Sequence, residues 1–172
     1  MKLSFKLLFL GVLFSFSANA QVLGTVVEVL SGDTYVVDIK QDSIHSSKQV
    51  VKLFGVKSPV LEGVSQNQPY AVEARDSMSF LVGKLVQLTS KFVDTHNTPY
   101  CEVLFERNKG VMLLNFYVLS KGCGMFDADG ISTRSIDYEM YKSSYLSAKK
   151  NNLGVWKGSA IDPFKWKTEH QN

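Results

Sequence analysis

The side chains with the clearest potential for chemistry are one aspartate, Asp33, and two lysines, Lys52 and Lys57. Asp33 belongs to the segment SGDTYVV, and the two lysines belong to VKLFGVKSPV. An aspartate can ligate a hard cation such as calcium, and a lysine is a point charge that binds phosphate. These three residues therefore offer one metal ligand and two cations.

Zinc and dithiol chemistry have no matching pattern in the chain. Its three histidines are scattered, and no Cys or His pair has the spacing of a zinc site. Cys101 and Cys123 lack the C-x-x-C spacing of a redox motif. In an exported chain they can form one disulfide, worth about 3 kcal/mol, or they can remain two buried thiols. Both alternatives stay open at this level.

The N-terminus has the pattern of a secretory signal peptide. Lys2 and Lys6 precede an apolar run over residues 7–16, which is too short to span a bilayer, and Ala18-Asn19-Ala20 fits a cleavage site. We expect cleavage after Ala20, residues 21–172 as one domain, and a secreted or periplasmic location. An uncleaved anchor is the alternative. Without the two lysines, the 19 basic and 16 acidic residues nearly balance, so binding of a polyanion would need a local patch.

Hydrophobic periodicity predicts five strands and three helices that position these residues. We expect strands at 22–30, 34–40, 50–56, 85–92 and 100–105, and helices at 70–82, 111–120 and 137–152, before an aromatic tail at 162–166. This order predicts an α+β, mainly β, fold: an OB-type five-stranded Greek-key barrel with about three packed helices. Aromatic residues at helical spacing, such as Tyr138, Tyr141 and Tyr145, suit a core stripe better than a surface on which bases stack.

The segments SGDTYVV, VKLFGVKSPV and LGVWKG, in this order, resemble the staphylococcal nuclease (thermonuclease) family. The helix start at residues 70–74, Asn115 with Leu119 and Gly122, and the tail at 163–166 are also similar to motifs of that family, so the resemblance covers nearly all of residues 21–172. It implies an OB barrel of the SNase-like kind and a site for calcium-dependent phosphodiester cleavage. In that site two aspartates hold calcium, a glutamate serves the water, and two arginines grip the phosphate.

The resemblance implies that most of these catalytic residues are replaced here. The family strand runs approximately V-R-L-x-G-I-D-A/T-P-E, and Lys52, Lys57 and Val60 occupy the places of its arginine, aspartate and glutamate. Thr98 occupies the place of the second arginine. A lysine at a metal position repels calcium, and valine can neither accept a proton nor orient water.

Asp33 corresponds to the first metal aspartate, and Ser58 to a residue that offers calcium only its backbone oxygen. Asp33 is either a weak calcium ligand or the cap of a tight turn, and the altered partners favour the cap. If the side chains of Asp33 and Lys57 converge on the former metal position, we expect an ion pair between them.

The sequence therefore predicts a thermonuclease-like domain that has lost hydrolase activity and acts as a binding or scaffold module. Lys52 and Lys57 would supply charge for a protein, a peptide, a nucleotide-like ligand or nucleic acid, without a cofactor. The alternative is a divergent, weakly active nuclease that uses Ca²⁺ with Asp33, Lys52 and Glu62.

Overall fold

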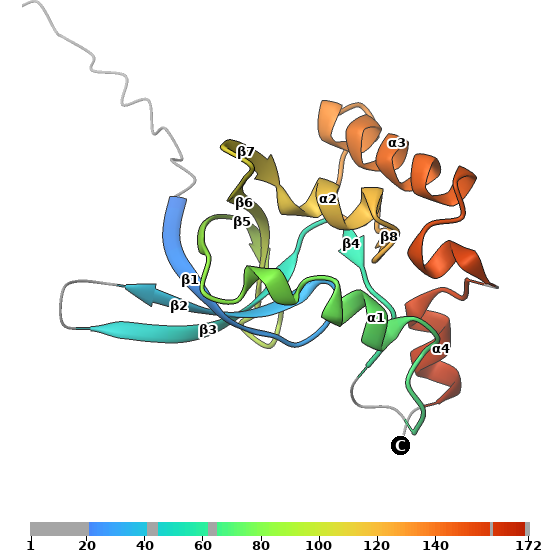
Figure 1. Cartoon of the computed structure of the whole chain (residues 1–172), viewed down its shortest axis with the longest axis horizontal. Helices are drawn as coiled ribbons and strands as arrows, with labels where there is room; N and C mark the ends of the chain where they lie inside the picture. Colours follow the sequence, from blue (N-terminus) through green and yellow to red (C-terminus); the bar gives the residue numbers. More distant parts are fainter. Residues whose placement is uncertain (1–20, 41–44, 62–64, 159, 171–172) are drawn as a thin grey trace, which may run out of the picture.

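Five strands close into a barrel at the centre of the computed structural model (Figure 1). They are β1 (Gln21–Val29), β2 (Thr34–Lys40), β3 (Ser46–Leu53), β5 (Leu85–Val93) and β6 (Pro99–Arg107). Neighbours pair antiparallel in the order β3-β2-β1-β5-β6, and a short parallel pairing of β3 with β6, Lys52 opposite Tyr100, closes the barrel. The predicted α+β, mainly β, OB-like fold is confirmed.

The structure describes residues 21–40, 45–61, 65–158 and 160–170. The predicted signal peptide and Glu62 lie outside the described residues. Within them, no helix is long and apolar enough to cross a membrane.

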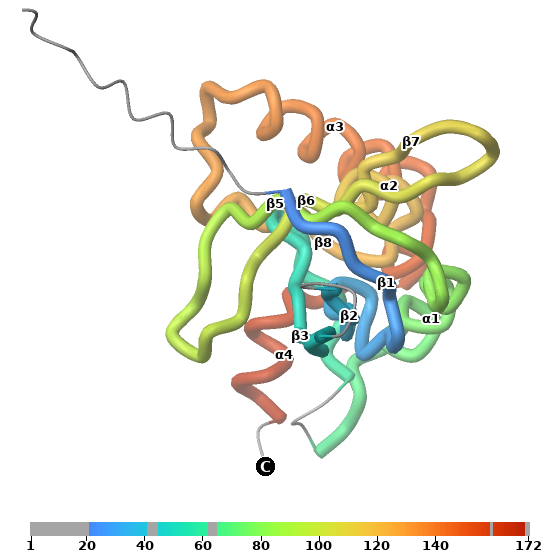
Figure 2. Tube along the Cα trace, turned by 90° about the vertical axis from the view of Figure 1, so that its left-hand side faces the viewer, coloured from blue at the N-terminus to red at the C-terminus, as the bar shows by residue number. Residues whose placement is uncertain are grey.

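Helices cover one side and one end of the barrel (Figures 1 and 2). They are α1 (Ala71–Asp76), the 3₁₀ turn η1 (Ser79–Leu81), α2 (Leu114–Ser120), α3 (Ile136–Lys150), the 3₁₀ turn η2 (Gly154–Lys157) and α4 (Pro163–Glu169). A short pairing of β4 (Val56–Lys57) with β8 (Met125–Phe126) joins the barrel to the helical side. The expected aromatic tail at 162–166 forms the start of α4, and Asp162 is the N-cap of this helix.

The expected helix at 111–120 was wrong in its first part, where the chain forms strand β7 (Gly110–Leu113). Asn108 and Lys109 both have positive φ, at 51° and 64°, and this two-residue turn pairs Arg107 with Gly110. Such turns match the twist of antiparallel strands, so the chain continues as a hairpin with β6 before the helix starts. The expected helix at 70–82 likewise divides into α1 and η1.

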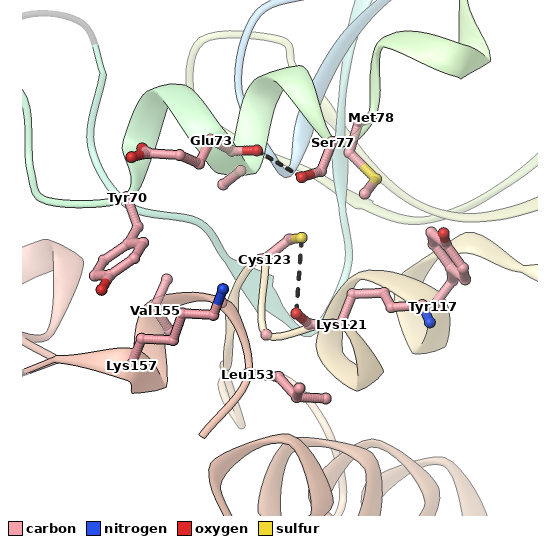
Figure 3. Close-up of a pocket in the computed structure, with 13 residues that line it drawn as sticks. Tyr70, Glu73, Ser77, Met78, Tyr117, Lys121, Cys123, Leu153, Val155 and Lys157 are labelled. Atoms are coloured by element: carbon pink, nitrogen blue, oxygen red, sulfur yellow. Dashed lines mark hydrogen bonds between the residues drawn. The ribbon is translucent and has the colours of Figure 1, made fainter. Parts of the chain in front are cut away.

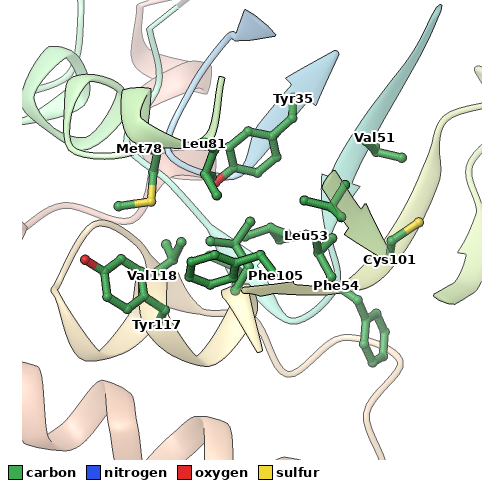
Figure 4. Packing of buried hydrophobic residues seen from close by; sticks show 14 of the residues in the cluster. Tyr35, Val51, Leu53, Phe54, Met78, Leu81, Cys101, Phe105, Tyr117 and Val118 are labelled. Atoms are coloured by element: carbon green, nitrogen blue, oxygen red, sulfur yellow. The ribbon is translucent and has the colours of Figure 1, made fainter. Parts of the chain in front are cut away.

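The aromatic stripe of α3 belongs to the core, as predicted. Tyr141 is 1% exposed, and Tyr138 and Tyr145 pack against the buried cluster. Gly55, at φ 75°, turns the chain from β3 into β4, and a Cβ there would lie 2.7 Å from the Tyr141 ring. Figure 4 shows part of this cluster, in which Tyr35, Leu53 and Phe105 of the barrel lie close to Leu81 of η1.

Cys101 and Cys123 are both free and buried, so the structure has two thiols and not the disulfide alternative. Cys101 lies on β6 opposite Leu53 and Ser90. Cys123 lies after α2, beside Ser77 of the segment between α1 and η1. Burial raises the pKa of both thiols, that of Cys101 to about 11.

We expect neither thiol to react with Ellman's reagent in the native protein at about pH 8, except at the rate of unfolding, because the thiolate is the reactive form. In urea both should react at once. An unfolded cysteine has a pKa of about 8.5. Because the thiol pKa is higher in the folded than in the unfolded protein, the free energy of unfolding keeps its full value below the unfolded pKa. It falls as the pH rises through the folded pKa. Fast labelling of the native protein, or no free thiol after denaturation without reductant, would contradict this.

Candidate functional site

A polar pocket of about 260 Å³ lies between the β1–β2 turn, the end of β3 and the segment after β4. It contains four of the six predicted site residues, Asp33, Lys52, Ser58 and Val60, and it excludes Lys57 and Thr98. Its complete lining is Leu30, Ser31, Asp33, Thr34, Lys52, Ser58, Pro59, Val60, Leu61 and Lys167. We call it the Asp33 pocket.

The Asp33 carboxylate accepts four short hydrogen bonds from its neighbours. Oδ1 accepts from the hydroxyls of Ser31 at 2.6 Å, Thr34 at 2.9 Å and Ser58 at 2.8 Å. Oδ2 accepts from the backbone N–H of Ser58 at 2.9 Å. A carboxylate has about four lone-pair sites, so protein donors occupy nearly all of its acceptor capacity. Asp33 thus ties the β1–β2 turn to the segment after β4.

Two further residues fix the position of this turn. The buried hydroxyl of Tyr35 donates to the carbonyl of Gly32 at 2.7 Å, and burial raises the Tyr35 pKa so that the donor stays protonated. A Cβ on Gly32 would lie 2.8 Å from the Cys123 carbonyl oxygen and 3.0 Å from the Ser58 Cβ. Only glycine lets the turn approach Ser58 closely enough for the Asp33 hydrogen bonds.

Lys52 stands between the Asp33 pocket and the β5–β6 loop. On β3 it lies opposite Thr34 of β2, and its Nζ lies 5.7 Å from the ring centroid of Tyr100. This cation–π contact holds the ammonium group beside β6.

The expected ion pair between Lys57 and Asp33 was wrong, because Lys57 pairs with the segment after β8. Its Nζ lies 3.1 Å from Asp127 Oδ1 and 3.8 Å from Asp129 Oδ2. Burial lowers the pKa of Lys57, but the hydrogen bond and charge of Asp127 outweigh burial, and the net pKa is raised. The β4–β8 pairing sets Lys57 opposite Met125, two residues before Asp127, and thus away from the pocket.

Thr98 lies in the β5–β6 loop and helps to shape it. The backbone N–H groups of Thr98 and His96 both donate to Asp94 Oδ1 at 2.9 Å. These hydrogen bonds, led by that of Thr98, lower the pKa of Asp94, and the charge of Lys52 also contributes. Thr98 therefore belongs to a turn beside the pocket.

The sequence reasoning missed Lys167, which reaches the Asp33 pocket from α4. This helix begins at Asp162, whose side chain accepts from the N–H groups of Phe164 and Lys165. Trp166 Nε1 then donates to the Gln66 carbonyl, which ties α4 to the segment before α1. Helical spacing after the capping Asp162 was the available signal, but sequence alone could not place Lys167 at the Asp33 pocket.

The Tyr100 ring that Lys52 contacts belongs to a small aromatic cluster. The rings of Phe92 and Tyr100 stack at a centroid distance of 4.4 Å, and Phe54 meets Phe92 edge-on at 6.0 Å. Phe92 remains 43% exposed, which leaves apolar ring surface open to solvent. An ammonium group beside an exposed aromatic surface suits a ligand that combines an anionic group with a flat ring.

A larger pocket, of about 660 Å³, lies between α1, the end of α2 and η2 (Figure 3). Its charged lining consists of Glu73, Lys121 and Lys157, and the Ser77 hydroxyl already donates to the Glu73 carbonyl at 2.7 Å. Cys123 lines it as a thiol, because burial raises its pKa. Its volume exceeds that of the Asp33 pocket, but none of the six predicted site residues lines it.

The chemical groups that the Asp33 pocket offers follow from its lining. Among the described residues, no three His, Cys, Asp or Glu side chains lie close enough together to hold a metal ion. Val60 stands in the lining and offers no base. The remaining groups are hydroxyls and two cations, Lys52 and Lys167, which can hold an anionic group.

The fold and the pocket define an OB-like barrel domain with a small polar pocket beside its β1–β2 turn. Comparison with known protein families finds no family model that matches the chain, and comparison with curated proteins finds no similar sequence.

Proposed function

We propose that this chain is a non-hydrolytic binding domain of the thermonuclease-like kind, which holds a nucleotide or single-stranded nucleic acid at the Asp33 pocket. The observation that carries the proposal is the Asp33 carboxylate, whose oxygens are engaged by Ser31, Thr34 and Ser58. An aspartate engaged in this way is a structural brace. The lysines around it are then the ligand-binding groups.

The arrangement of the fold supports this ligand class. OB folds bind oligonucleotides on the surface of their second and third strands and on the loops between strands 1–2 and 4–5. Here those loops are the turn that contains Asp33 and the β5–β6 loop, and Lys52 of β3 lies between them. Lys52 and Lys167 would contact phosphate, and the exposed ring of Phe92 would meet a base. The predicted export signal would place such a domain in a secreted or periplasmic setting.

We expect a fluorescein-labelled oligothymidine to bind in low salt, as measured by fluorescence anisotropy. Lys52→Ala and Lys167→Ala should each weaken binding about fivefold, as for solvent-exposed charge pairs. The dependence of log K on log salt should become shallower by about 0.7 for each lost phosphate contact. Lys150→Ala, an exposed lysine at the end of α3 that does not line the pocket, is the control and should change little. Equal effects of all three substitutions, or no binding, would refute the proposal.

The same samples test the alternative of a weakly active nuclease, two of whose proposed residues, Asp33 and Lys52, line this pocket. We expect the labelled strand to remain intact after long incubation with calcium, because the described lining of the pocket has no histidine and no carboxylate besides the engaged Asp33. Calcium-dependent cutting that Asp33→Ala abolishes would establish the alternative. Cutting that survives this substitution indicates a contaminant.

A further inference from the structure

Arg107 lies at the end of β6 with its guanidinium group between two aromatic rings. The guanidinium carbon lies 4.8 Å from the ring centroids of both Phe80 and Tyr117. The two rings meet edge-on at 5.9 Å, and Phe105 packs against both of them. A guanidinium group stacked in this way is held in place, so little side-chain freedom is lost when it binds a ligand.

This guanidinium group has no anionic partner within the described part of the protein. No carboxylate there lies within ion-pair distance of Arg107, and its Nη1 is buried without a hydrogen-bond acceptor. A buried donor that lacks an acceptor costs about 1–3 kcal/mol. Such groups are rare in folded proteins, and a bound ion or water is a common explanation for them.

Arg107 lines a pocket of about 540 Å³ together with Phe80, Lys84, Leu85, Glu106 and Asn108. Two hydrogen bonds fix the backbone of Lys84. Its N–H donates to the Leu81 carbonyl at 2.8 Å, and its carbonyl accepts from the Val26 N–H at 3.0 Å. The lining thus has two cations, an apolar wall and one carboxylate, that of the exposed Glu106. A volume of this order suits a small organic molecule.

We propose that this Arg107 pocket is a second ligand site, which binds a small organic oxyanion, a carboxylate or a phosphate ester. The guanidinium fork and the Lys84 ammonium would hold the oxyanion, because a guanidinium matches both anions with two parallel hydrogen bonds. The organic part of the ligand would rest on Phe80 and Leu85. The site shares no residue with the Asp33 pocket, so it does not depend on the function proposed there.

The experiment is a titration of ¹⁵N-labelled protein with benzoate in one arm and phenyl phosphate in the other, each at constant ionic strength. We expect saturable shifts in the Arg107 side-chain Nε–H and in the backbone N–H groups of Lys84, Leu85 and Asn108. The arm that saturates at lower concentration identifies the oxyanion. Shifts that rise linearly in both arms would overturn the proposal.

Substitutions separate a built site from general charge attraction. Lys84→Ala should weaken binding about fivefold, and Arg107→Lys, which retains the charge and loses the fork, should weaken it about tenfold. Lys109→Ala removes a charge at the hairpin tip that does not line the pocket, and Lys52→Ala removes one at the Asp33 pocket; both should leave affinity within about twofold. Equal losses for Lys84→Ala and Lys109→Ala would reduce the effect to net charge and overturn the proposal. If Arg107→Lys does not fold, the Lys84 and Lys109 variants still decide.

Discussion

Replacement of Asn115 by alanine is expected to lower the free energy of unfolding by about 3–4 kcal/mol, a large loss for a single polar substitution. Asn115 is fully buried at the second position of α2. Its Oδ1 accepts from the Val103 N–H at 3.0 Å, and its Nδ2 donates to the carbonyls of Phe54 at 2.8 Å and Cys101 at 2.9 Å. One amide thus joins α2 to β6 and to the end of β3, and alanine would leave these backbone groups without it.

Urea denaturation measures this effect, and an unchanged m value shows that the loss lies in stability. Asn151→Ala is the matched control, because that amide makes one exposed hydrogen bond to the Ser147 carbonyl and should matter by less than about 0.5 kcal/mol. The Cys101 carbonyl also accepts from the Phe54 N–H, so the predicted loss comes mainly from the Val103 N–H and the Phe54 carbonyl. A loss for Asn115→Ala no larger than for the control would contradict the account.

Replacement of Asp33 by alanine in a calcium-free buffer is expected to cost about 2–3 kcal/mol, because Ser58 then loses the acceptor of its N–H and of its hydroxyl. Ser58 is 6% exposed, so water cannot readily replace the carboxylate there. Asp33→Asn should be intermediate, since one amide oxygen can still accept. Chemical denaturation with a chelator present measures all three proteins.

Asp76→Ala is the control for this series, because its carboxylate makes an exposed ion pair with Arg75 and should contribute at most about 1 kcal/mol. Repeating the measurement with millimolar calcium distinguishes a brace from a metal ligand. A brace predicts the same stability with and without calcium. If calcium stabilises the wild type and Asp33→Ala abolishes that gain, Asp33 is a metal ligand and the binding proposal is wrong in its main observation.

The sequence by itself determined the barrel and most of its elements. Alternating apolar residues from Tyr35 to Ile39 predicted β2 from local information, because a half-buried strand repeats every second residue. The aromatic spacing of Tyr138, Tyr141 and Tyr145 predicted a core-facing helix for the same kind of reason. The order of these segments then limits the topology to a few barrels, and an OB-like one was predicted.

The resemblance also implied that Asp33, Lys52, Ser58 and Val60 belong to one site, and the four residues line one pocket. The hydrogen bonds of Asp33 could not be predicted from the sequence. Whether Asp33 binds calcium or accepts from the Ser58 N–H depends on how closely the β1–β2 turn approaches the segment after β4. Gly32 permits the close approach, and only the tertiary structure shows it.

The tertiary structure alone decided which distant residues meet. Lys57 pairs with Asp127, Lys167 reaches the Asp33 pocket from α4, and the Arg107 guanidinium lies between rings of η1 and α2. Each contact joins different elements of the fold, through the β4–β8 pairing for Lys57 and through helix packing for Lys167 and Arg107, and no short-range pattern encodes it. Long charged side chains add to the difficulty, because a lysine can reach several neighbours from one backbone position. The residues packed around each of these charged side chains therefore determine what it contacts.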